Sequence, residues 1–317
     1  MRPLKNDTKA PEMKNFLRLR LIYLKHILLI CLVKNMDMQE SKPFKKIDIR
    51  EVVTEKSPAV ARILPGFVYR YIHRIMHLDF INDFLKEHGH LQGVDFVDAV
   101  VDSFNVKENI IDFDNVPSMG RFIFASNHPL GGFDGMMLMK IIHKKFSSFK
   151  FLTNDVLMNI SNLKPVFVPV NKHGSYAREA ALALHEAYQS DTQILIFPAG
   201  LASRKIKGEI KDLKWHKHFI SKAIEYKRDI IPVYVDGRNS NRFYIIAKLR
   251  KLFRIKWNLE MFFLPDETYR HRNKVVTVYF GKPLPYKLFD KSKTHQEWAD
   301  HVKTLVYKLP SGDNKSR

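Results

Sequence analysis

Only one of the 317 residues is a cysteine, Cys31. A single cysteine cannot form an intramolecular disulfide bond, and it excludes a cysteine-rich zinc site. The scarcity of cysteine fits a reducing compartment such as the cytoplasm. The sequence also has no zinc-finger, homeodomain or RNP signature, so these nucleic-acid-binding modules are excluded.

Acidic residues are few compared with basic ones. The chain has 33 Asp and Glu against 53 Lys and Arg, which gives a formal net charge of +20 and a pI of about 9.8. Such an excess does not determine a fold, but it favours a partner with an acidic surface. Nucleic acid, anionic lipid headgroups and an acidic carrier protein all fit. A basic nucleic-acid-binding protein is therefore one alternative function. Only the charge supports it, so we expect no nucleic-acid partner.

The apolar run near the N-terminus, residues 21–33, is shorter than the ~20 residues of a membrane-spanning helix and contains Lys25 and His26. No small-residue cleavage site follows it, which argues against a signal peptide. It is either a basic interfacial helix or an upstream extension, with Met36 or Met38 as the functional start. We expect residues 1–40 to be an extension outside the domain.

Residues 47–117 have a helical pattern. Ser57 followed by Pro58 is a good helix start. Apolar residues then recur three and four positions apart, as in Leu64, Val68, Ile72, Ile75 and Met76. We expect this segment to be a helical preface to the domain that follows.

From residue 118 to residue 310, short β-branched or aromatic runs alternate with helical stretches. Strands are predicted at 122–126, 149–154, 166–170, 193–199, 230–237 and 275–281. Helices are predicted at 135–145, 175–189 and 215–227. Such alternation predicts an α/β domain with a mostly parallel central sheet flanked by helices. The tail, 311–317, is expected to be disordered.

The segment S-N-H-P-L-G-G-F-D-G, residues 126–135, directly follows a predicted strand. Ligands of α/β sheets bind at the carboxyl ends of strands, so His128 is well placed to remove a proton from a substrate. Asp134 can fold back over the Gly-Gly turn to the other imidazole nitrogen and stabilise the protonated ring. The alternative is that Asp134 is only a helix N-cap and His128 a polar loop residue.

Three further segments accompany this one. Asn171 and Lys172 follow the strand at 166–170, F-P-A-G-L-A-S-R ends at Arg204, and a later strand begins Ile-Ile-Pro-Val. In this order the four blocks resemble the phospholipid/glycerol acyltransferase superfamily, over about residues 47–285. The first block is most similar to that of the hemolysin-like branch, which includes lyso-ornithine-lipid O-acyltransferases.

The chain departs from the superfamily pattern at two places. Five residues separate His128 from Asp134, where the common form has four. The third block reads Pro-Ala-Gly instead of Pro-Glu-Gly, with Ala199 in the place of the glutamate. The lost carboxylate suggests an altered acceptor site.

The resemblance implies a glycerol-3-phosphate acyltransferase-like fold and an enzyme that moves a fatty acyl group from acyl carrier protein or acyl-CoA to a lyso-lipid hydroxyl. We expect a lyso-aminolipid of the ornithine or glycine type as acceptor, with 1-acylglycerol-3-phosphate as the alternative. No cofactor beyond the thioester and no metal is expected. The expected location is the cytoplasmic side of the bacterial inner membrane, as a peripheral protein on its anionic surface.

The residues that we expect to bind substrate, in addition to the catalytic His128 and Asp134, lie close to strand ends. They are Asn127, Gly131, Gly132, Lys172, Gly200, Ser203 and Arg204. Lys172 and Arg204 would hold an anionic headgroup or the donor's phosphate, unless they are solvated surface charges. Backbone amides near Gly131, Gly132 or Gly200 would stabilise the oxyanion.

Other interpretations remain open. A thioesterase or other hydrolase needs a nucleophile or a third ligand beside His128, and no G-x-S-x-G motif is present. His216 and His218 lie two positions apart, which favours a surface helix over a metal site. The apolar and basic segment 243–257 is either a membrane-docking helix or a core helix with extended Lys and Arg.

Overall fold

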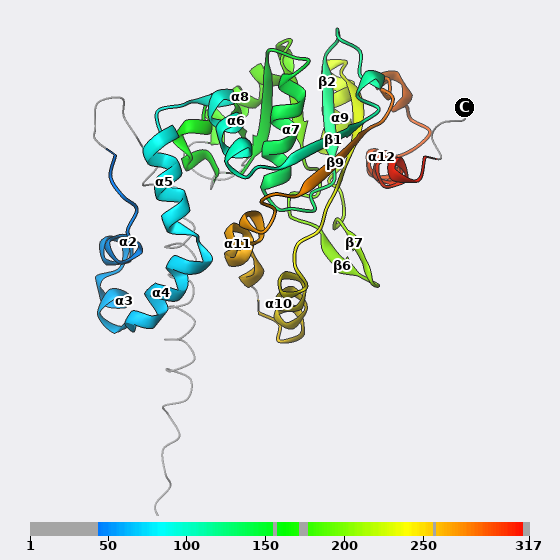
Figure 1. Cartoon of the computed structure of the whole chain (residues 1–317). Coiled ribbons are helices and arrows are strands. Elements are labelled where there is room, and N and C mark those ends of the chain that lie inside the picture. Colours follow the sequence, from blue (N-terminus) through cyan, green and yellow to red (C-terminus); the bar gives the residue numbers. More distant parts are fainter. Residues whose placement is uncertain (1–43, 155–156, 171–176, 256–257, 313–317) are drawn as a thin grey trace, which may run out of the picture.

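The computed structural model describes residues 44–154, 157–170, 177–255 and 258–312. A seven-stranded sheet with the order β1-β9-β8-β2-β5-β3-β4 forms its centre (Figure 1). The strands of this sheet are β1 (Lys107–Ile111), β2 (Phe122–Ser126), β3 (Phe149–Thr153), β4 (Phe167–Pro169), β5 (Gln193–Ile196), β8 (Asp229–Asp236) and β9 (Val275–Phe280). Every neighbouring pair is parallel except β8 and β9. The predicted α/β class with a mostly parallel sheet is confirmed.

Helices cover both faces of the sheet. The longer ones in this domain are α7 (Phe133–His143), α8 (Ala177–Gln189), α9 (His218–Tyr226), α10 (Asn241–Leu252) and α12 (His295–Lys308). Side chains of β2 alternate between the two faces, as a pleated strand requires. Phe122 and Phe124 pack in the cluster that contains α6 and α7, while Ile123 and Ala125 pack in the cluster that contains α8, α9 and α12.

The segment before the sheet is helical as far as Ser103. It forms α2 (Ile49–Lys56), α3 (Pro58–Ile63), α4 (Gly66–Ile75), α5 (Leu78–His88) and α6 (Gly93–Ser103). The prediction of a helical preface is wrong for β1, which pairs with β9 at the edge of the sheet. The sequence of β1, K-E-N-I-I, has only two apolar residues and lacks strand alternation, so pairing with β9 determines its conformation.

All six predicted strands and all three predicted helices are present, with ends that shift by a few residues. Further elements of this domain were not predicted, and α12 is one of them. The hairpin of β6 (Arg204–Ile206) and β7 (Glu209–Lys211) follows β5, and α11 (Leu264–Tyr269) follows α10. Within the described residues, no helix has both the length and the apolar character to cross a membrane. The apolar run 21–33 lies outside these residues.

Candidate active site

The loop between β2 and α7 brings His128 and Asp134 together. The carboxylate Oδ2 of Asp134 lies 2.9 Å from the imidazole Nδ1 of His128. An ionised carboxylate can only accept a hydrogen bond, so Nδ1–H is the donor and Nε2 is the free base position in the neutral ring. The arrangement matches the predicted pair. Asp134 does more than cap α7, whose N-cap residue is Gly132.

Two glycines allow the five intervening residues to fit. Gly131 has φ 71° and Gly132 has φ 144°, both in the region that residues with a side chain rarely adopt. A β-carbon on Gly131 would also lie 2.6 Å from the side chain of Leu264. The turn therefore depends on glycine, and it returns the chain so that Asp134 reaches His128.

Asp134 is completely buried and has several hydrogen-bond donors. Besides His128, its carboxylate accepts from the amides of Leu130 at 2.9 Å, Gly132 at 3.1 Å and Gly135 at 3.0 Å. Burial by itself would raise the pKa of Asp134, but the charge of His128 and these hydrogen bonds outweigh burial and lower that pKa. Asp134 is therefore held as an anion beside the imidazole.

The surroundings of His128 make it a stronger base than an isolated histidine. Burial disfavours its protonated form, but Asp134, through its charge and its hydrogen bond, and then Asp212 raise the pKa of His128 above the ordinary value. The side chain of His128 is 15% exposed, and its ring stacks on Phe197 with centroids 4.0 Å apart. Among the described residues Nε2 has no hydrogen-bond partner, so no contact there occupies this base position.

Asn127 faces away from His128, into the sheet. Its side-chain oxygen accepts from the amide of Val235 at 2.7 Å, and its side-chain nitrogen donates to the carbonyl of Val235 at 2.9 Å. This two-fold contact ties the end of β2 to β8. The buried amide of Asn127 thus positions the loop, and a direct contact with substrate stays a prediction.

Ser203 and Asp212 hold the main chain of His128. The amide of Ser203 donates to the carbonyl of His128 at 2.7 Å. Asp212 Oδ1 accepts from the Ser203 hydroxyl at 2.5 Å and from the His128 amide at 3.2 Å. Asp212 Oδ2 accepts from the indole of Trp215 at 2.8 Å. Burial raises the pKa of Asp212 despite these hydrogen bonds.

Arg204 has protein partners for its guanidinium group. It donates to Glu260 at 2.8 Å and to the carbonyl of Ala202 at 2.6 Å, and its side chain is 11% exposed. Arg250, on α10, lies 3.0 Å from the other oxygen of the fully buried Glu260. These contacts give Arg204 a structural task, linking the loop after β5 to α10. Headgroup binding by Arg204 stays a prediction.

The amides proposed for the oxyanion differ in their availability. The amide of Gly132 donates to Asp134, and that of Gly200 donates to the carbonyl of Phe197 at 2.9 Å. The amide of Gly131 has no acceptor among the described residues, so it is the free donor of the three.

Ala199 packs in the apolar cluster beside α9, where a carboxylate would be desolvated. Lys172 lies outside the described residues.

The sequence analysis missed four residues of the site: Asp212, Asn239, Phe197 and Glu260. Asn239, in the loop after β8, donates to the carbonyl of Pro129 at 3.2 Å and so supports the loop from a third side. Asp212 and Glu260 lie 84 and 56 residues from the partners they hold, so no local pattern identifies them. Phe197 belongs to the third block and directly follows β5, and this position at a strand end could have identified it as a site residue.

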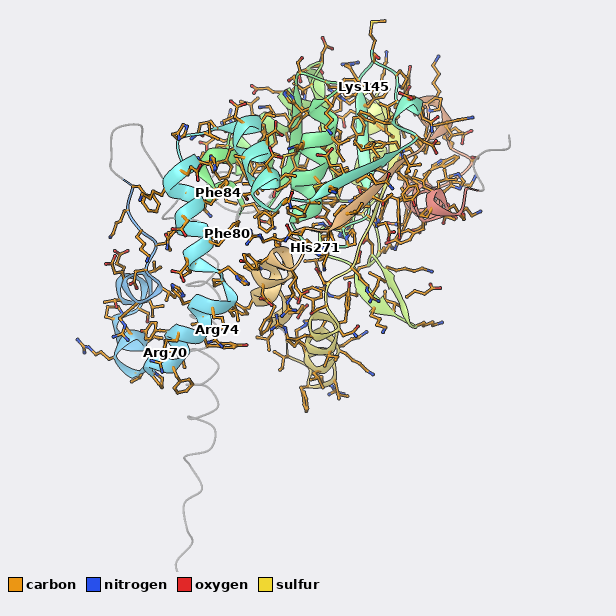
Figure 2. The ribbon with its side chains drawn as sticks, in the orientation of Figure 1. Arg70, Arg74, Phe80, Phe84, Lys145 and His271 are labelled. Carbon is orange, nitrogen blue, oxygen red and sulfur yellow. The ribbon has the colours of Figure 1, made fainter. Side chains whose placement is uncertain are left out.

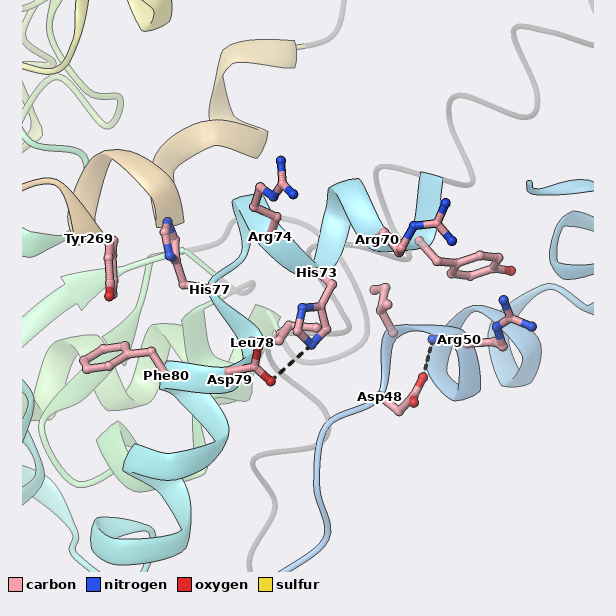
Figure 3. A pocket seen from close by; sticks show the side chains of 12 residues that line it. Asp48, Arg50, Arg70, His73, Arg74, His77, Leu78, Asp79, Phe80 and Tyr269 are labelled. Carbon is pink, nitrogen blue, oxygen red and sulfur yellow. Dashed lines mark hydrogen bonds and ion pairs between the residues drawn. The ribbon is translucent and has the colours of Figure 1, made fainter. Parts of the chain in front are cut away.

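A cavity of about 700 Å³ lies between α2, α4, α5 and α11, as Figure 3 shows. Its walls include Arg50, Arg70 and Arg74, and none of the predicted site residues lines it. His77 closes one side, stacked on Tyr269 with centroids 3.8 Å apart. The cavity is therefore separate from the His128 pair.

Within the described residues, no group of three or more His, Cys, Asp or Glu could hold a metal ion.

Comparisons with known proteins show the family to which the chain belongs. A family model described as Acyltransferase matches residues 51–314. A lyso-glycine lipid O-acyltransferase of Bacteroides thetaiotaomicron is 44% identical over 264 residues, which are 83% of this chain and 97% of that protein. A lyso-glycine lipid O-acyltransferase of Phocaeicola vulgatus is 42% identical over 264 residues, or 83% and 95%.

A solved 1-acyl-sn-glycerophosphate acyltransferase from Thermotoga maritima aligns with 95% of this chain and 98% of its own, at 14% identity and a TM-score of 0.42. The family model and the two relatives span most of the chain, including both residues of the His128–Asp134 pair. The chain belongs to the acyltransferase family, and the protein is an acyltransferase.

Proposed function

We propose that this protein transfers a fatty acyl group from a thioester to the hydroxyl of a lyso-glycine lipid, a glycine whose nitrogen carries a 3-hydroxyacyl chain. The His128–Asp134 pair, with imidazole Nε2 open, is the observation that carries the proposal. The names of the two relatives, at 44% and 42% identity, support the acceptor. The amino-acid headgroup also agrees with the acceptor class expected from the missing glutamate at Ala199.

The reaction proceeds by direct transfer. Nε2 of His128 takes the proton of the acceptor hydroxyl while the hydroxyl oxygen attacks the carbonyl carbon of the thioester. The tetrahedral intermediate then collapses, the carbon–sulfur bond breaks, and the departing sulfur takes the proton from the His128 imidazolium, which restores the neutral base. Asp134 keeps the ring oriented and stabilises the imidazolium that forms. No acyl-enzyme is needed, because a thiol is already a good leaving group.

The free amide of Gly131 is the donor that best fits the oxyanion of the intermediate. Gly132 and Gly200 leave open space at the backbone, since a β-carbon on either would meet nothing within 4 Å. We assign these two positions to the approach of the substrates. Lys172 and Arg204 remain proposed contacts for an anionic group of the acceptor or the donor, while Asn127 and Ser203 support the loop on which His128 lies.

Acyl carrier protein or acyl-CoA is the proposed donor, and each presents its thioester on a phosphopantetheine arm. The net charge of +20 suits either donor, as well as an anionic membrane. Because the acceptor is a lipid, the enzyme would work as a peripheral protein, on the cytoplasmic side of the bacterial inner membrane.

An acylation assay with purified protein tests the proposal. Acyl carrier protein or CoA bearing a labelled acyl chain is incubated with and without lyso-glycine lipid. We expect labelled diacyl lipid only when the acceptor is present. Release of labelled free acid at the same rate without acceptor would instead identify a thioesterase.

A further inference from the structure

The outer face of α10 carries large apolar side chains that no other part of the described chain covers. Ile245, Leu249, Leu252 and Phe253 are 55%, 45%, 69% and 69% exposed. The first three lie four and three positions apart, so they form one stripe along the helix. Exposed apolar side chains that lie together on a protein surface indicate a site of contact with a partner.

Basic residues flank the stripe and acidic ones do not. Lys248, Lys251 and Arg254 are exposed, and residues 241–255 contain no Asp or Glu. In the described part of the chain, none of these three cations has a carboxylate partner. A helix with apolar and unpaired basic side chains on its outer face has the composition of a segment that lies on an anionic lipid surface.

The inner face of α10 is fixed to the site. Phe243 and Tyr244 are buried together with Ala202, which precedes Ser203 in the loop after β5. Arg250 and Arg204 meet on the buried carboxylate of Glu260. The other side of α10 already packs against the domain. The outer stripe is therefore not the side by which this helix joins the core.

The stripe lies on the side of α10 opposite its buried residues, and α10 lies at the same end of the sheet as the His128 pair. α10 begins shortly after β8, which runs parallel to β2, so it lies at the strand ends that carry His128. Figure 1 shows α3 and α4 at the same end of the molecule, and Figure 2 shows Arg70 and Arg74 there. Phe67 of α4, 64% exposed, adds a further apolar side chain to this end.

We propose that the outer face of α10 docks on an anionic lipid bilayer and so presents His128 to an acceptor that remains in the membrane. This inference rests on the proposed function only in its choice of a lipid acceptor. Ile245, Leu249, Leu252 and Phe253 enter the interface, and Lys248, Lys251 and Arg254 lie among the phosphates. An acidic carrier protein would use the cations, but it would leave the apolar stripe exposed.

Co-sedimentation with vesicles that contain no substrate tests the docking. The full chain is mixed with phosphatidylglycerol–phosphatidylcholine vesicles and with phosphatidylcholine vesicles. The double variant Leu252→Ser/Phe253→Ser should bind the anionic vesicles at least about tenfold more weakly than the parent. The control Leu182→Ser, on α8 and 57% exposed in the parent, should bind like the parent.

A charge-matched pair of variants tests the basic residues. Lys248→Glu/Lys251→Glu should lose affinity for anionic vesicles by roughly fivefold or more for each cation removed. Lys282→Glu/Lys287→Glu changes two exposed lysines elsewhere and the net charge equally. This control should lose clearly less. Equal losses in the two variants would mean that general charge, not α10, attracts the protein.

Three results would overturn the proposal: unchanged vesicle binding by Leu252→Ser/Phe253→Ser, equal losses in the two charge variants, or a parent dimer that this apolar variant converts to a monomer. Turnover of a short-chain acceptor in solution is a further measurement, and the apolar variant should retain it. Failure of docking differs from failure of the proposed function, because the vesicles hold no acceptor and binding requires no acyl transfer.

Discussion

The main-chain amide of His128 donates to Asp212 Oδ1 at 3.2 Å, so a buried carboxylate that does not touch the imidazole holds the backbone of the proposed base. The same oxygen accepts from the hydroxyl of Ser203. The third block of the sequence is thereby joined to the first through one atom. This contact explains why serine belongs in the third block, even though its hydroxyl is buried and directed away from solvent.

Asp212→Asn should therefore weaken both the fold and the reaction. Asparagine has one acceptor oxygen, so either Trp215 or the pair of donors at Oδ1 loses its partner, at a cost of about 1–3 kcal/mol in the free energy of unfolding. Because Asp212 helps to raise the pKa of His128, the acid limb of kcat/KM should also move to lower pH. Urea unfolding and a pH–rate profile measure the two effects.

The control for this variant is Asp300→Asn, which changes an exposed carboxylate in the same way. It should leave both measurements unchanged. A purely structural Asp212 would lower stability without moving the acid limb, and that pattern would contradict its electrostatic role.

His128→Ala should lower kcat by ~10²–10⁴-fold or more, because it removes the proposed base. The loss in packing is small, since the ring lies at the edge of the site against Phe197, and the far-UV circular dichroism spectrum should not change. His216→Ala is the matched control, because His216 is exposed and lies in the segment before α9. Near-parental turnover by a folded His128→Ala protein would contradict the mechanism.

The pH dependence follows from the raised pKa of His128. A general base works only when it is unprotonated, so kcat/KM should rise with pH and level off above a pKa higher than the ordinary histidine value of about 6.5. Asp134→Asn removes the charge that favours the imidazolium. Its acid limb should shift to lower pH while the plateau falls by up to ~10⁴-fold.

An acid limb in the same place for Asp134→Asn and the parent would show that another group controls the profile. Solvent-exposed histidines provide a check on this assignment. His216→Ala should retain both the plateau and the limb of the parent.

The sequence predicts an element correctly where the local pattern of apolar residues agrees with the burial of that element in the fold. The residues F-I-F-A-S predict β2 because all five side chains are buried between two helical layers. β1 could not be predicted, because its burial is partial and pairing with β9 stabilises it. The His128–Asp134 pair could be predicted because the two residues are only six positions apart and the two glycines between them allow the turn that joins them.

The contacts of Arg204 show what a sequence pattern leaves out. Its place beyond a strand end was correct, since Arg204, the last residue of the third block, follows the end of β5 and begins β6. Its partner, Glu260, comes from a distant segment after α10, and nothing in the local sequence links the two. A long-range ion pair is a property of the assembled fold, so the sequence pattern could not reveal that Arg204 also joins two elements.

Removing Glu260 should destabilise the protein strongly. Glu260→Ala leaves Arg204 without its carboxylate in a buried position, and breaking a buried pair in this way costs about 3–5 kcal/mol. Burial already lowers the pKa of Arg204, which shows that the environment disfavours an unpaired charge. Equilibrium unfolding in urea measures the loss.

Glu209→Ala is the comparison, because Glu209 pairs with Lys211 on the exposed β6–β7 hairpin. Its unfolding midpoint should match that of the parent, since exposed ion pairs contribute little. Equal effects of the two substitutions would mean that the Glu260 cluster does not stabilise the link between the site loop and α10.

The identity of the acceptor leads to the last prediction. Lyso-glycine lipid carries a carboxylate and an amide near its hydroxyl-bearing chain, whereas lysophosphatidate carries a phosphate on glycerol. A site built for one polar headgroup leaves buried groups unpaired when the other binds, so discrimination appears in the transition state. We expect kcat/KM for lyso-glycine lipid to exceed that for lysophosphatidate by at least about tenfold, or 1.4 kcal/mol.

Both acceptors are anionic, so the charge of +20 attracts each of them and cannot produce this ratio. The comparison should therefore use one acyl donor, matched chain lengths and mixed micelles of the same composition, so that both lipids reach the enzyme equally. High salt screens the general attraction and should lower both rates without removing the preference. A ratio that favours lysophosphatidate would assign the protein to phospholipid synthesis, with the His128 chemistry unchanged but a different acceptor in the site.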